Sequence, residues 1–260
     1  MSDPLIHADP KQRFSSRVEN YIRYRPGYPP AILQPLQADC GLAPGAQVAD
    51  VGSGPGNLAR IFLDFGCAVT GVEPNDAMRA AGERLLAGFP AWKSQAGSAE
   101  ATGLPDASVD FITAGQAFHW FDLPKTRPEF VRILRPGGWL VLVWNERKVE
   151  ANPFQRDYER LLLDFSLDYD SVNHRHVDPG LIQAFYGTQP VRSAVFGSAQ
   201  SFDYPALEGR ALSSSYVPMP GHARHGPFLA GLRALFDRNQ HGGQVTFEYD
   251  TRLYYGRLPA

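Results

Sequence analysis

A glycine-rich turn follows a short apolar run in the first quarter of the chain. Residues Val48–Val51 lead directly into Gly52, Gly54 and Gly56, which alternate with other residues. Glycine adopts backbone conformations with positive φ and lets a ligand approach the main chain closely. The apolar run has the length of a buried strand, and the residues after Gly56 have the apolar spacing of a helix. This segment therefore predicts a strand, a ligand-binding turn and a helix, which together form a unit of α/β folds.

The same alternation of strand and helix continues through the first 145 residues. Strands are expected at 47–51, 68–72, 91–95, 109–114 and 139–144, and helices at 57–65, 76–87 and 124–134. Residues 135–138 (Arg-Pro-Gly-Gly) are expected to form a tight turn before the last of these strands. Strands that alternate with helices predict a parallel sheet with helices on both faces. We therefore expect an α/β fold with a Rossmann-like, doubly wound sheet.

The flanking segments depart from this alternation. Helices are expected at 14–25, 30–39 and 154–165, a polar surface loop at 168–180, and further helices at 205–215 and 226–239. Two long strands with alternating apolar residues are expected at 191–204 and 244–258. These patterns predict that the sheet is mostly parallel with an antiparallel final strand, and that helices cap its C-terminal edge.

Four parts are expected along the 260 residues, a length that suits one large domain with an insertion. Residues 1–40 form an N-terminal helical segment over the ligand site, and residues 41–150 form the ligand-binding core. Residues 151–190 form a helical cap insertion. Residues 191–260 form a terminal antiparallel strand pair, with cap helices inserted at 205–240.

The composition restricts the partners and the cellular compartment. The formal net charge is −2, from 25 basic and 27 acidic residues, so we expect no nucleic acid and no membrane surface as partner. Cys40 and Cys67 form no CxxC motif, which favours reduced thiols in a cytoplasmic protein. The N-terminus lacks the pattern of a secretory signal, and no run of 18 apolar residues predicts a transmembrane helix. The oligomeric state is left open.

The residues around the glycine turn distinguish between cofactors. A dinucleotide fingerprint would place its third small residue at position 57, where this chain has Asn57. Asp50 precedes the turn, where a carboxylate would repel a pyrophosphate but attract an ammonium or sulfonium group. Glu73 ends the next apolar run and suits the two hydroxyls of a ribose. The helix that begins after Gly56 offers its N-terminus to a carboxylate. These residues favour S-adenosyl-L-methionine, although Asp50 also suits a structural role as a cap of loop amides.

Four motifs resemble those of the class I S-adenosylmethionine-dependent methyltransferases, in the methyltransferase type 11 group. They are Asp50–Gly56, Val72–Asn75, Gly97–Glu100 and Leu134–Gly138. The resemblance covers residues 14–146 best, and the general layout is similar to that of trans-aconitate methyltransferase-like proteins. Ser98 departs from the family pattern, because many members carry an Asp there that meets the adenine amino group. The resemblance implies cofactor contacts by Asp50, Gly52, Ser53, Gly54, Gly56, Asn57, Glu73, Pro74, Met78, Ser98, Ala99, Glu100, Gly115 and Gln116.

The segment after the fourth strand is the candidate reaction centre, because ligands of open α/β sheets bind at the carboxyl ends of the strands. His119 is the histidine of the predicted sheet region and is the candidate catalytic residue. It suits a general base or a substrate contact, and equally a packed histidine between aromatic neighbours. Trp120 suits either a contact with a cation or plain aromatic packing.

Candidate substrate-binding residues come from several parts of the chain. They are Tyr21, Arg25, Trp120, Asn145 and Tyr216. Arg25 has the chemistry to bind a carboxylate of the cofactor or of an acidic substrate. The run His174–Asp178 lacks the spacing of a metal site, so no metal is expected.

The resulting hypothesis is an S-adenosylmethionine-dependent methyltransferase that acts on a small-molecule acceptor by in-line methyl transfer. Two alternatives remain at this point. One is a non-catalytic relative that binds a nucleoside and acts as an interaction module, since a fold does not guarantee an activity. The other is an NAD(P)-dependent dehydrogenase, which Asp50 and Asn57 disfavour. The identity of the acceptor and the atom that is methylated are left open.

Overall fold

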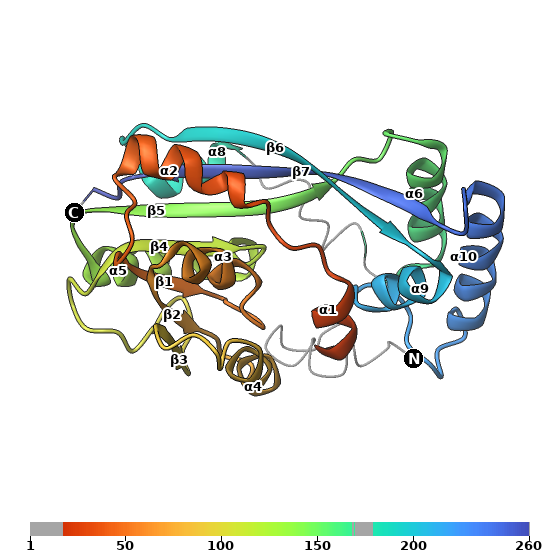
Figure 1. The fold of residues 1–260 in the computed structure, drawn as a ribbon, viewed down its shortest axis with the longest axis horizontal. Helices are drawn as coiled ribbons and strands as arrows, with labels where there is room; N and C mark the ends of the chain where they lie inside the picture. Colours follow the sequence, from red (N-terminus) through yellow and green to blue (C-terminus); the bar gives the residue numbers. More distant parts are fainter. Residues whose placement is uncertain (1–17, 168, 170–178, 260) are drawn as a thin grey trace. The chain divides into compact units, whose positions relative to one another are not determined.

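The computed structural model describes residues 18–167, 169 and 179–259 of the chain (Figure 1). In chain order its elements are α1 (Val18–Tyr24), the 3-10 helix η2 (Pro30–Ile32), α2 (Leu33–Cys40), β1 (Gln47–Val51), α3 (Asn57–Phe65), β2 (Ala68–Val72), α4 (Asp76–Leu85), β3 (Trp92–Gln95), β4 (Val109–Gly115), the 3-10 helix η3 (Phe118–Trp120), α5 (Leu123–Ile133), β5 (Leu134–Arg147), α6 (Pro153–Phe165), α8 (Pro179–Tyr186), β6 (Arg192–Phe202), α9 (Tyr204–Leu212), α10 (His225–Asn239) and β7 (Val245–Gly256). The predicted alternation of strands and helices is thus confirmed.

The strands of the described residues form one seven-stranded sheet in the order β3-β2-β1-β4-β5-β7-β6. Strand β1 pairs in parallel with β2 on one side and β4 on the other, so that Asp50 lies opposite Gly71 and Thr113. The pairs β2–β3 and β4–β5 are also parallel. The sheet is mostly parallel with one antiparallel pair, which confirms the expected fold class.

Strand β5 differs from the prediction at its start. The expected turn at 135–138 lies within β5, because the strand begins at Leu134. Val109 pairs with Leu134, yet Phe111 pairs with Trp139, so β5 holds extra residues that have no partner in β4. Gly137, with φ of +80°, permits the irregular backbone that returns the strand to register at Trp139. The glycine pair therefore forms a bulge in the strand rather than a separate turn.

Internal contacts divide the chain into two compact units. The core unit consists of Gly27–Asn145, His176–Phe196 and Thr251–Ala260. The helical unit consists of Met1–Pro26, Glu146–Arg175 and Gly197–Asp250. Strands β5, β6 and β7 each contribute residues to both units. The four-part division expected from the sequence stays a prediction.

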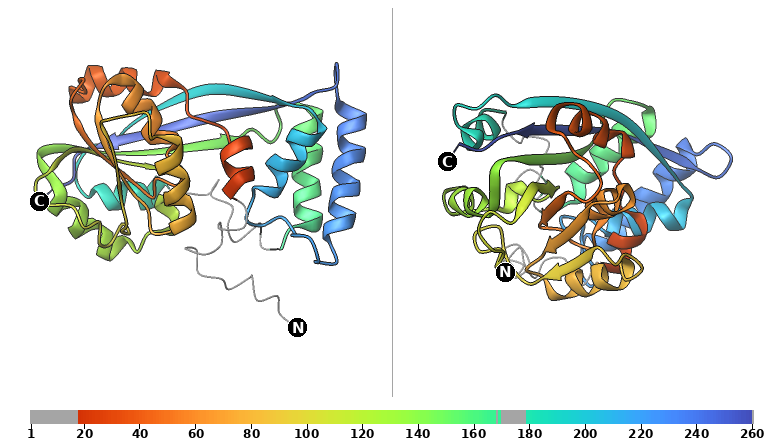
Figure 2. Two further views of the ribbon diagram at one scale, coloured as in Figure 1. Left: turned by 60° about the horizontal axis from the view of Figure 1, so that its bottom comes forward. Right: turned by 60° about the vertical axis from the view of Figure 1, so that its left-hand side comes forward.

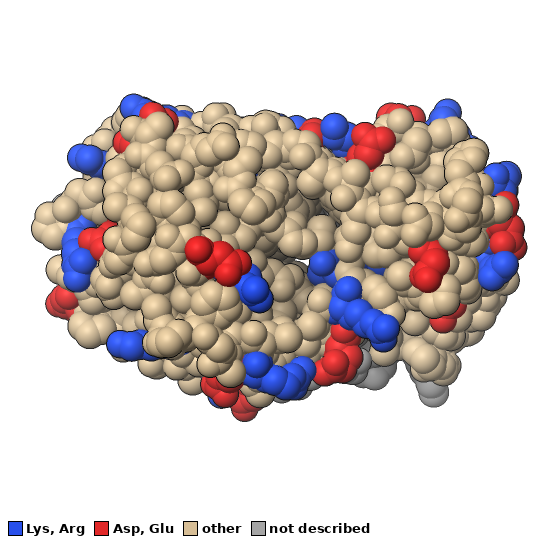
Figure 3. All heavy atoms as spheres, in the orientation of Figure 1, with Lys and Arg blue, Asp and Glu red and all other residues tan. Residues whose placement is uncertain are grey.

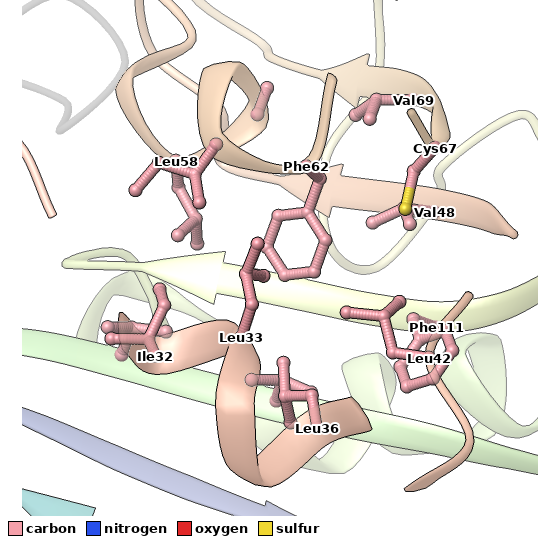
Figure 4. Packing of buried hydrophobic residues seen from close by; sticks show 14 of the residues in the cluster. Ile32, Leu33, Leu36, Leu42, Val48, Leu58, Phe62, Cys67, Val69 and Phe111 are labelled. Atoms are coloured by element: carbon pink, nitrogen blue, oxygen red, sulfur yellow. The ribbon is translucent and has the colours of Figure 1, made fainter. Parts of the chain in front are cut away.

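Helices cover both faces of the sheet in the core unit (Figure 2). Helices α2 and α3 pack on one face, and α5 and α8 pack on the other. Figure 4 shows Leu33 and Leu36 of α2, Phe62 of α3 and Val48 of β1 in one apolar cluster. Each fully buried apolar side chain of this size contributes about 1.5–3 kcal/mol. This packing fixes the ends of the strands that carry the candidate site.

The helical unit has its own apolar core, built from α6, α9, α10 and the adjoining parts of β6 and β7. The Phe247 ring lies 4.9 Å from the ring of Phe154 and 5.0 Å from that of Tyr158. Asn152 caps α6 and Asp203 caps α9, because each side chain accepts a hydrogen bond from a backbone amide of the first turn. This unit is therefore stabilised by its own packing and capping.

Charged side chains of both signs are interspersed on the face that Figure 3 shows, in line with the small net charge. Cys40 and Cys67 both carry free thiols. In the part of the chain that the structure describes, each helix is too short or too polar to cross a membrane.

Candidate functional site

Glu73 faces the glycine turn at the carboxyl ends of β1 and β2. Its Oε2 accepts a hydrogen bond from the Gly54 amide at 2.9 Å, and its Oε1 accepts one from the Asn75 amide at 2.8 Å. The side chain is 8% exposed, and burial raises its pKa while these two hydrogen bonds oppose the rise. A single carboxylate thus joins the glycine turn to the start of α4. It lies where it can also accept hydrogen bonds from a ligand bound in the turn.

The glycines of the turn are required by their backbone angles and by close packing. Gly52 has φ of +69° and Gly56 has φ of +90°. A Cβ on Gly52 would lie 2.6 Å from the Cβ of Ala117, and one on Gly56 would lie 2.4 Å from Cδ1 of Leu86. By contrast, a Cβ on Gly54 would meet open space, although its φ is +54°. Ala117 and Leu86 thus pack closely against Gly52 and Gly56, whereas the space beside Gly54 is open.

Helix α3 begins directly after the turn and presents its N-terminal amides there. Gly56 is the N-cap, and no side chain caps the helix. Helix N-termini carry partial positive charge and bind carboxylates well. Asn57, the first helical residue, is partly exposed. The start of α3 can therefore hold an anionic group of a ligand.

Asp50 is buried in the middle of the sheet, below the glycine turn. It is 1% exposed, and Oδ1 accepts a hydrogen bond from the Thr113 hydroxyl at 2.8 Å. The backbone amide of Ala59 also acts on the carboxyl group, whereas Oδ2 makes no hydrogen bond of standard geometry with any described residue. Burial raises the pKa of Asp50 to about 7. A nearby cation would stabilise the ionised form, so both the ligand-binding and the structural interpretation of Asp50 are compatible with this environment.

The loop after β3 is closed by its own backbone. The amide of Ser98 donates to the carbonyl of Ala101 at 3.1 Å, and the Ala101 amide donates back at 3.2 Å. Ala99 is buried, and the Glu100 carboxylate accepts a hydrogen bond from the Asp122 amide at 2.9 Å. Ser98 itself is partly exposed. Of the predicted adenine contacts, Ser98 is thus better placed than Glu100, whose carboxylate holds the segment before α5.

Pro74 and Met78 lie beside Glu73 at the start of α4. Asn75 caps this helix, because its Oδ1 accepts a hydrogen bond from the Met78 amide at 3.0 Å. Met78 is 4% exposed, whereas Pro74 is partly exposed. The capped helix start therefore gives the loop after β2 a defined conformation.

Gln116 follows β4 with a backbone conformation that is rare for its residue type. Its φ is +55°, in a region that costs a non-glycine residue about 1–2 kcal/mol. Its side-chain amide donates to the Asn145 carbonyl at 3.2 Å and accepts from the Asn145 amide at 3.1 Å. A Cβ on the preceding Gly115 would lie 2.6 Å from the Tyr28 hydroxyl. Strained backbone of this kind clusters at functional sites, which singles out this loop.

Asn145, a predicted substrate contact, is 4% exposed and its side chain has two partners within the core unit. Its Nδ2 donates to the Gly27 carbonyl at 3.0 Å, and its Oδ1 accepts from the Thr251 hydroxyl at 2.5 Å. A substrate contact would have to replace one of these bonds. The structure therefore gives Asn145 a structural role, and its substrate role stays a prediction.

His119 and Trp120 belong to the short helix η3, which is anchored by an aromatic cluster. Phe118 is buried, and its ring lies 5.0 Å from that of Phe185 and 6.1 Å from that of Trp144. The His119 ring lies 4.8 Å from that of Trp120, and both residues are partly exposed. Burial lowers the pKa of His119 to about 4. The imidazole is thus neutral at pH 7 and a weak base, which suits a hydrogen-bonding contact better than proton abstraction.

The remaining predicted substrate residues lie in the helical unit. The guanidinium of Arg25 lies over the Tyr21 ring, 5.1 Å from its centre, and it also acts electrostatically on Tyr216. The structure adds two arginines to this group, Arg147 and Arg210, which sequence reasoning missed. Neither forms part of a local motif, because one ends a strand and the other lies on a helix far along the chain.

The predicted residues thus fall into two groups. The core unit holds His119, Trp120, Asn145 and all of the predicted cofactor contacts, whereas the helical unit holds Tyr21, Arg25 and Tyr216. Residues 174–178, where a metal site was considered, lie outside the described residues. Among the residues that the structure does describe, His, Cys, Asp and Glu side chains form no group of three that could hold a metal ion.

The sequence is similar to several methyltransferases. A family model described as a methyltransferase domain matches residues 49–142. An uncharacterized methyltransferase of Schizosaccharomyces pombe is 33% identical over 247 residues, which covers 93% of this chain and 95% of that protein. One of Mycobacterium tuberculosis is 40% identical over 134 residues, or 52% of each chain, so this match spans about half the length of that relative.

Solved structures of methyltransferases are similar to this one. A protein of Anaeromyxobacter dehalogenans, named as a type II methyltransferase, is 25% identical with a TM-score of 0.67 and covers 91% of this chain and 100% of its own. Phosphoethanolamine N-methyltransferase 2 of Haemonchus contortus, solved with S-adenosyl-L-methionine, is 13% identical with a TM-score of 0.56 and covers 97% of this chain and 59% of its own. The second likeness is one of fold alone.

Proposed function

We propose, because the chain belongs to the class I S-adenosylmethionine-dependent methyltransferases, that it transfers a methyl group from S-adenosyl-L-methionine to a small-molecule acceptor. One observation carries the cofactor assignment to this chain. The Glu73 carboxylate faces the glycine turn and bonds the Gly54 amide. This places an acidic acceptor of hydrogen bonds beside a turn that a ligand can approach closely.

The residues present fit the cofactor's chemistry. Glu73 is the proposed partner of the ribose hydroxyls, and the N-terminal amides of α3 are the proposed partners of the carboxylate. The buried carboxylate of Asp50 favours the cationic part of the molecule by Coulomb attraction. Ser98 and the buried Ala99 are the proposed lining beside the adenine. Anionic and cationic parts of the ligand thus each have a partner of opposite charge.

When bound, the cofactor would supply a methyl group attached to a positively charged sulfur. The sulfur is a good leaving group, because it departs as a neutral thioether. The main task of the protein is then to position and align the acceptor, which supplies much of the rate in such a displacement. His119 is neutral at pH 7 because burial holds its pKa near 4, so we assign it a hydrogen bond to the acceptor. An acceptor group that is already ionised, such as a carboxylate, would need no strong base.

Isothermal titration calorimetry with S-adenosylhomocysteine tests the proposal. We expect saturable binding in the micromolar range, and no binding of NAD or NADP under the same conditions. A lack of S-adenosylhomocysteine binding at millimolar concentration would overturn the assignment. Binding without release of S-adenosylhomocysteine from S-adenosylmethionine across a broad acceptor panel would instead favour the non-catalytic, nucleoside-binding alternative.

A further inference from the structure

Three arginine side chains converge in the helical unit, and we call them the arginine cluster. Arg25 follows α1, Arg147 ends β5 and Arg210 lies on α9. Arg210 is 7% exposed, and the side chain of Arg147 is 9% exposed. A guanidinium remains charged at all physiological pH values, and arginine is rarely buried unless it is paired. The surroundings of these groups therefore need to balance their charge.

Shared contacts hold the cluster together. Arg25 Nη2 and Arg210 Nη1 both donate to the Ser214 hydroxyl, at 3.4 and 3.2 Å. The guanidinium groups of Arg147 and Arg210 each lie 5.9 Å from the centre of the Phe247 ring. The three guanidinium groups therefore border one small region, with aromatic rings as part of its wall.

The described residues balance the charge of the arginine cluster only in part. Among the described residues, Arg147 has an ion pair with Glu159, and the Tyr169 hydroxyl supports both partners. Arg25 bonds the hydroxyl and the carbonyl of Ser213, at the C-terminal end of α9, and Arg210 is paired with no carboxylate of the described residues. In the part of the chain that the structure describes, one carboxylate is thus paired with the three guanidinium groups. Two positive charges remain for which the described residues supply hydrogen-bond acceptors but no anion.

Two buried polar groups of this region interact with one another. Nε of Arg210 and the hydroxyl of Tyr249, which is 2% exposed, make no hydrogen bond of standard geometry with described residues, but a looser contact of the Tyr249 hydroxyl raises the pKa of the Arg210 guanidinium. A hydroxyl supplies a hydrogen-bond acceptor but no anion, so among the described residues the charge of Arg210 stays without a carboxylate partner.

Tyr216 is the point at which the three guanidinium groups act together. Burial disfavours ionisation of its phenol, but Arg25, Arg210 and Arg147 outweigh this effect and lower the pKa of Tyr216. All three guanidinium groups therefore lie close enough to act on one phenol. Tyr216 and Arg25 are partly exposed, so this region is not completely closed.

We propose that the arginine cluster is the binding site for an anionic group of the methyl acceptor, with a charge of about −2, such as a pair of carboxylates or a phosphomonoester. The proposal rests on the proposed function, because it names the acceptor's chemistry. Guanidinium groups bind both carboxylate and phosphate by paired hydrogen bonds. A neutral acceptor would supply no counter-ion for the two guanidinium groups that no carboxylate of the described residues pairs.

The first test measures binding of simple probes to the full chain at constant ionic strength. Succinate, inorganic phosphate and the neutral succinamide are titrated by calorimetry in a buffer of cationic amine and chloride. We expect saturable binding of succinate or phosphate in the millimolar range and none of succinamide. Absence of saturable binding of both anions would overturn the proposal.

Three variants locate the site. Arg25→Gln and Arg210→Gln should each weaken anion binding by about tenfold or more, since each removes a charge-assisted partner. Arg25→Lys should bind with intermediate affinity, because it keeps the charge without the paired donors. Arg238→Gln is the matched control, since Arg238 is exposed in the same unit and pairs with Asp157. Equal affinity in the wild type, Arg25→Gln and Arg210→Gln would show an adventitious anion effect and overturn the proposal.

S-adenosylhomocysteine binding by the same proteins separates this inference from the proposed function. The affinity for S-adenosylhomocysteine should be unchanged in all of the variants, and this binding also shows that they are folded. If Arg210→Gln does not fold, the titrations of Arg25→Gln and the wild type still decide whether the arginine cluster binds anions. Loss of S-adenosylhomocysteine binding in the wild type refutes the proposed function, whereas intact cofactor binding without anion binding refutes only the present inference. Release of S-adenosylhomocysteine with dicarboxylates or with phosphomonoesters identifies the source of the anion, and turnover of neutral amides alone overturns the proposal.

Discussion

Replacing Glu73 by Gln is the sharpest test of the cofactor site, because one oxygen atom becomes an amide group at nearly constant size. In the wild type the two carboxylate oxygens accept hydrogen bonds from the amides of Gly54 and Asn75. The Gln side chain has one acceptor oxygen, so one of these backbone donors loses its partner. We expect the free energy of unfolding to fall by about 1–3 kcal/mol, which lowers the melting temperature by roughly 2–4 °C per kcal/mol.

The Glu73→Gln variant should also bind the cofactor more weakly, by more than the loss of folded protein accounts for. Hydrogen bonds to a charged acceptor are worth about 1.5–3 kcal/mol, compared with about 0.5–1.5 kcal/mol for neutral pairs. If both ribose hydroxyls donate to Glu73, the change to Gln costs about 2–3 kcal/mol, so the Kd for S-adenosylhomocysteine rises by roughly 30- to 150-fold. Calorimetry well below the melting temperature of Glu73→Gln measures this change on folded protein.

Glu83→Gln is the matched control, because Glu83 is exposed on α4 and its replacement removes the same charge. It should leave both the melting temperature and the Kd unchanged. A folded Glu73→Gln variant that binds S-adenosylhomocysteine as tightly as the wild type would refute the ribose assignment. It would also show that the hydrogen bond between Glu73 and Gly54 serves the fold alone.

Three further substitutions test the structure around the turn. Gly56→Ala should lower the free energy of unfolding by about 2–4 kcal/mol, because its φ is +90° and the new Cβ would meet Leu86, whereas Gly88→Ala meets nothing within 4 Å and should be neutral in the same urea titration. Asp50→Asn tests the pKa of Asp50, which burial raises from 3.8 to about 7. The stability that the neutral carboxyl confers is fully present below pH 3.8 and is lost as pH rises to 7, so the difference in unfolding free energy between Asp50→Asn and the wild type should shift by about 2.5 kcal/mol in favour of the variant from pH 5 to pH 8. A difference that does not change with pH would contradict the raised pKa. Asn145→Ala should lower the free energy of unfolding by about 1–3 kcal/mol, because the buried Thr251 hydroxyl and the Gly27 carbonyl lose their partner, and an unchanged urea midpoint would argue against its structural role.

The local features of the core could be read from the sequence because they depend on neighbouring residues. Apolar runs and their periods predicted the strands and helices, and the glycine turn predicted where β1 gives way to α3. The place of Glu73 followed from its position at the end of an apolar run, since parallel strands bring their carboxyl ends to one edge. Even the bulge of β5 was visible as a glycine pair, although its form within the strand was not.

The tertiary structure decided which polar groups are already satisfied and which are not. Asn145 and Glu100 looked like site residues, yet partners distant in sequence occupy their side chains. Arg147 and Arg210 carried no local signal, and only folding places them beside Arg25. Periodicity records whether a residue is buried, because burial repeats along an element. It does not record which distant residue lies opposite, and that identity determines the charge balance of a site.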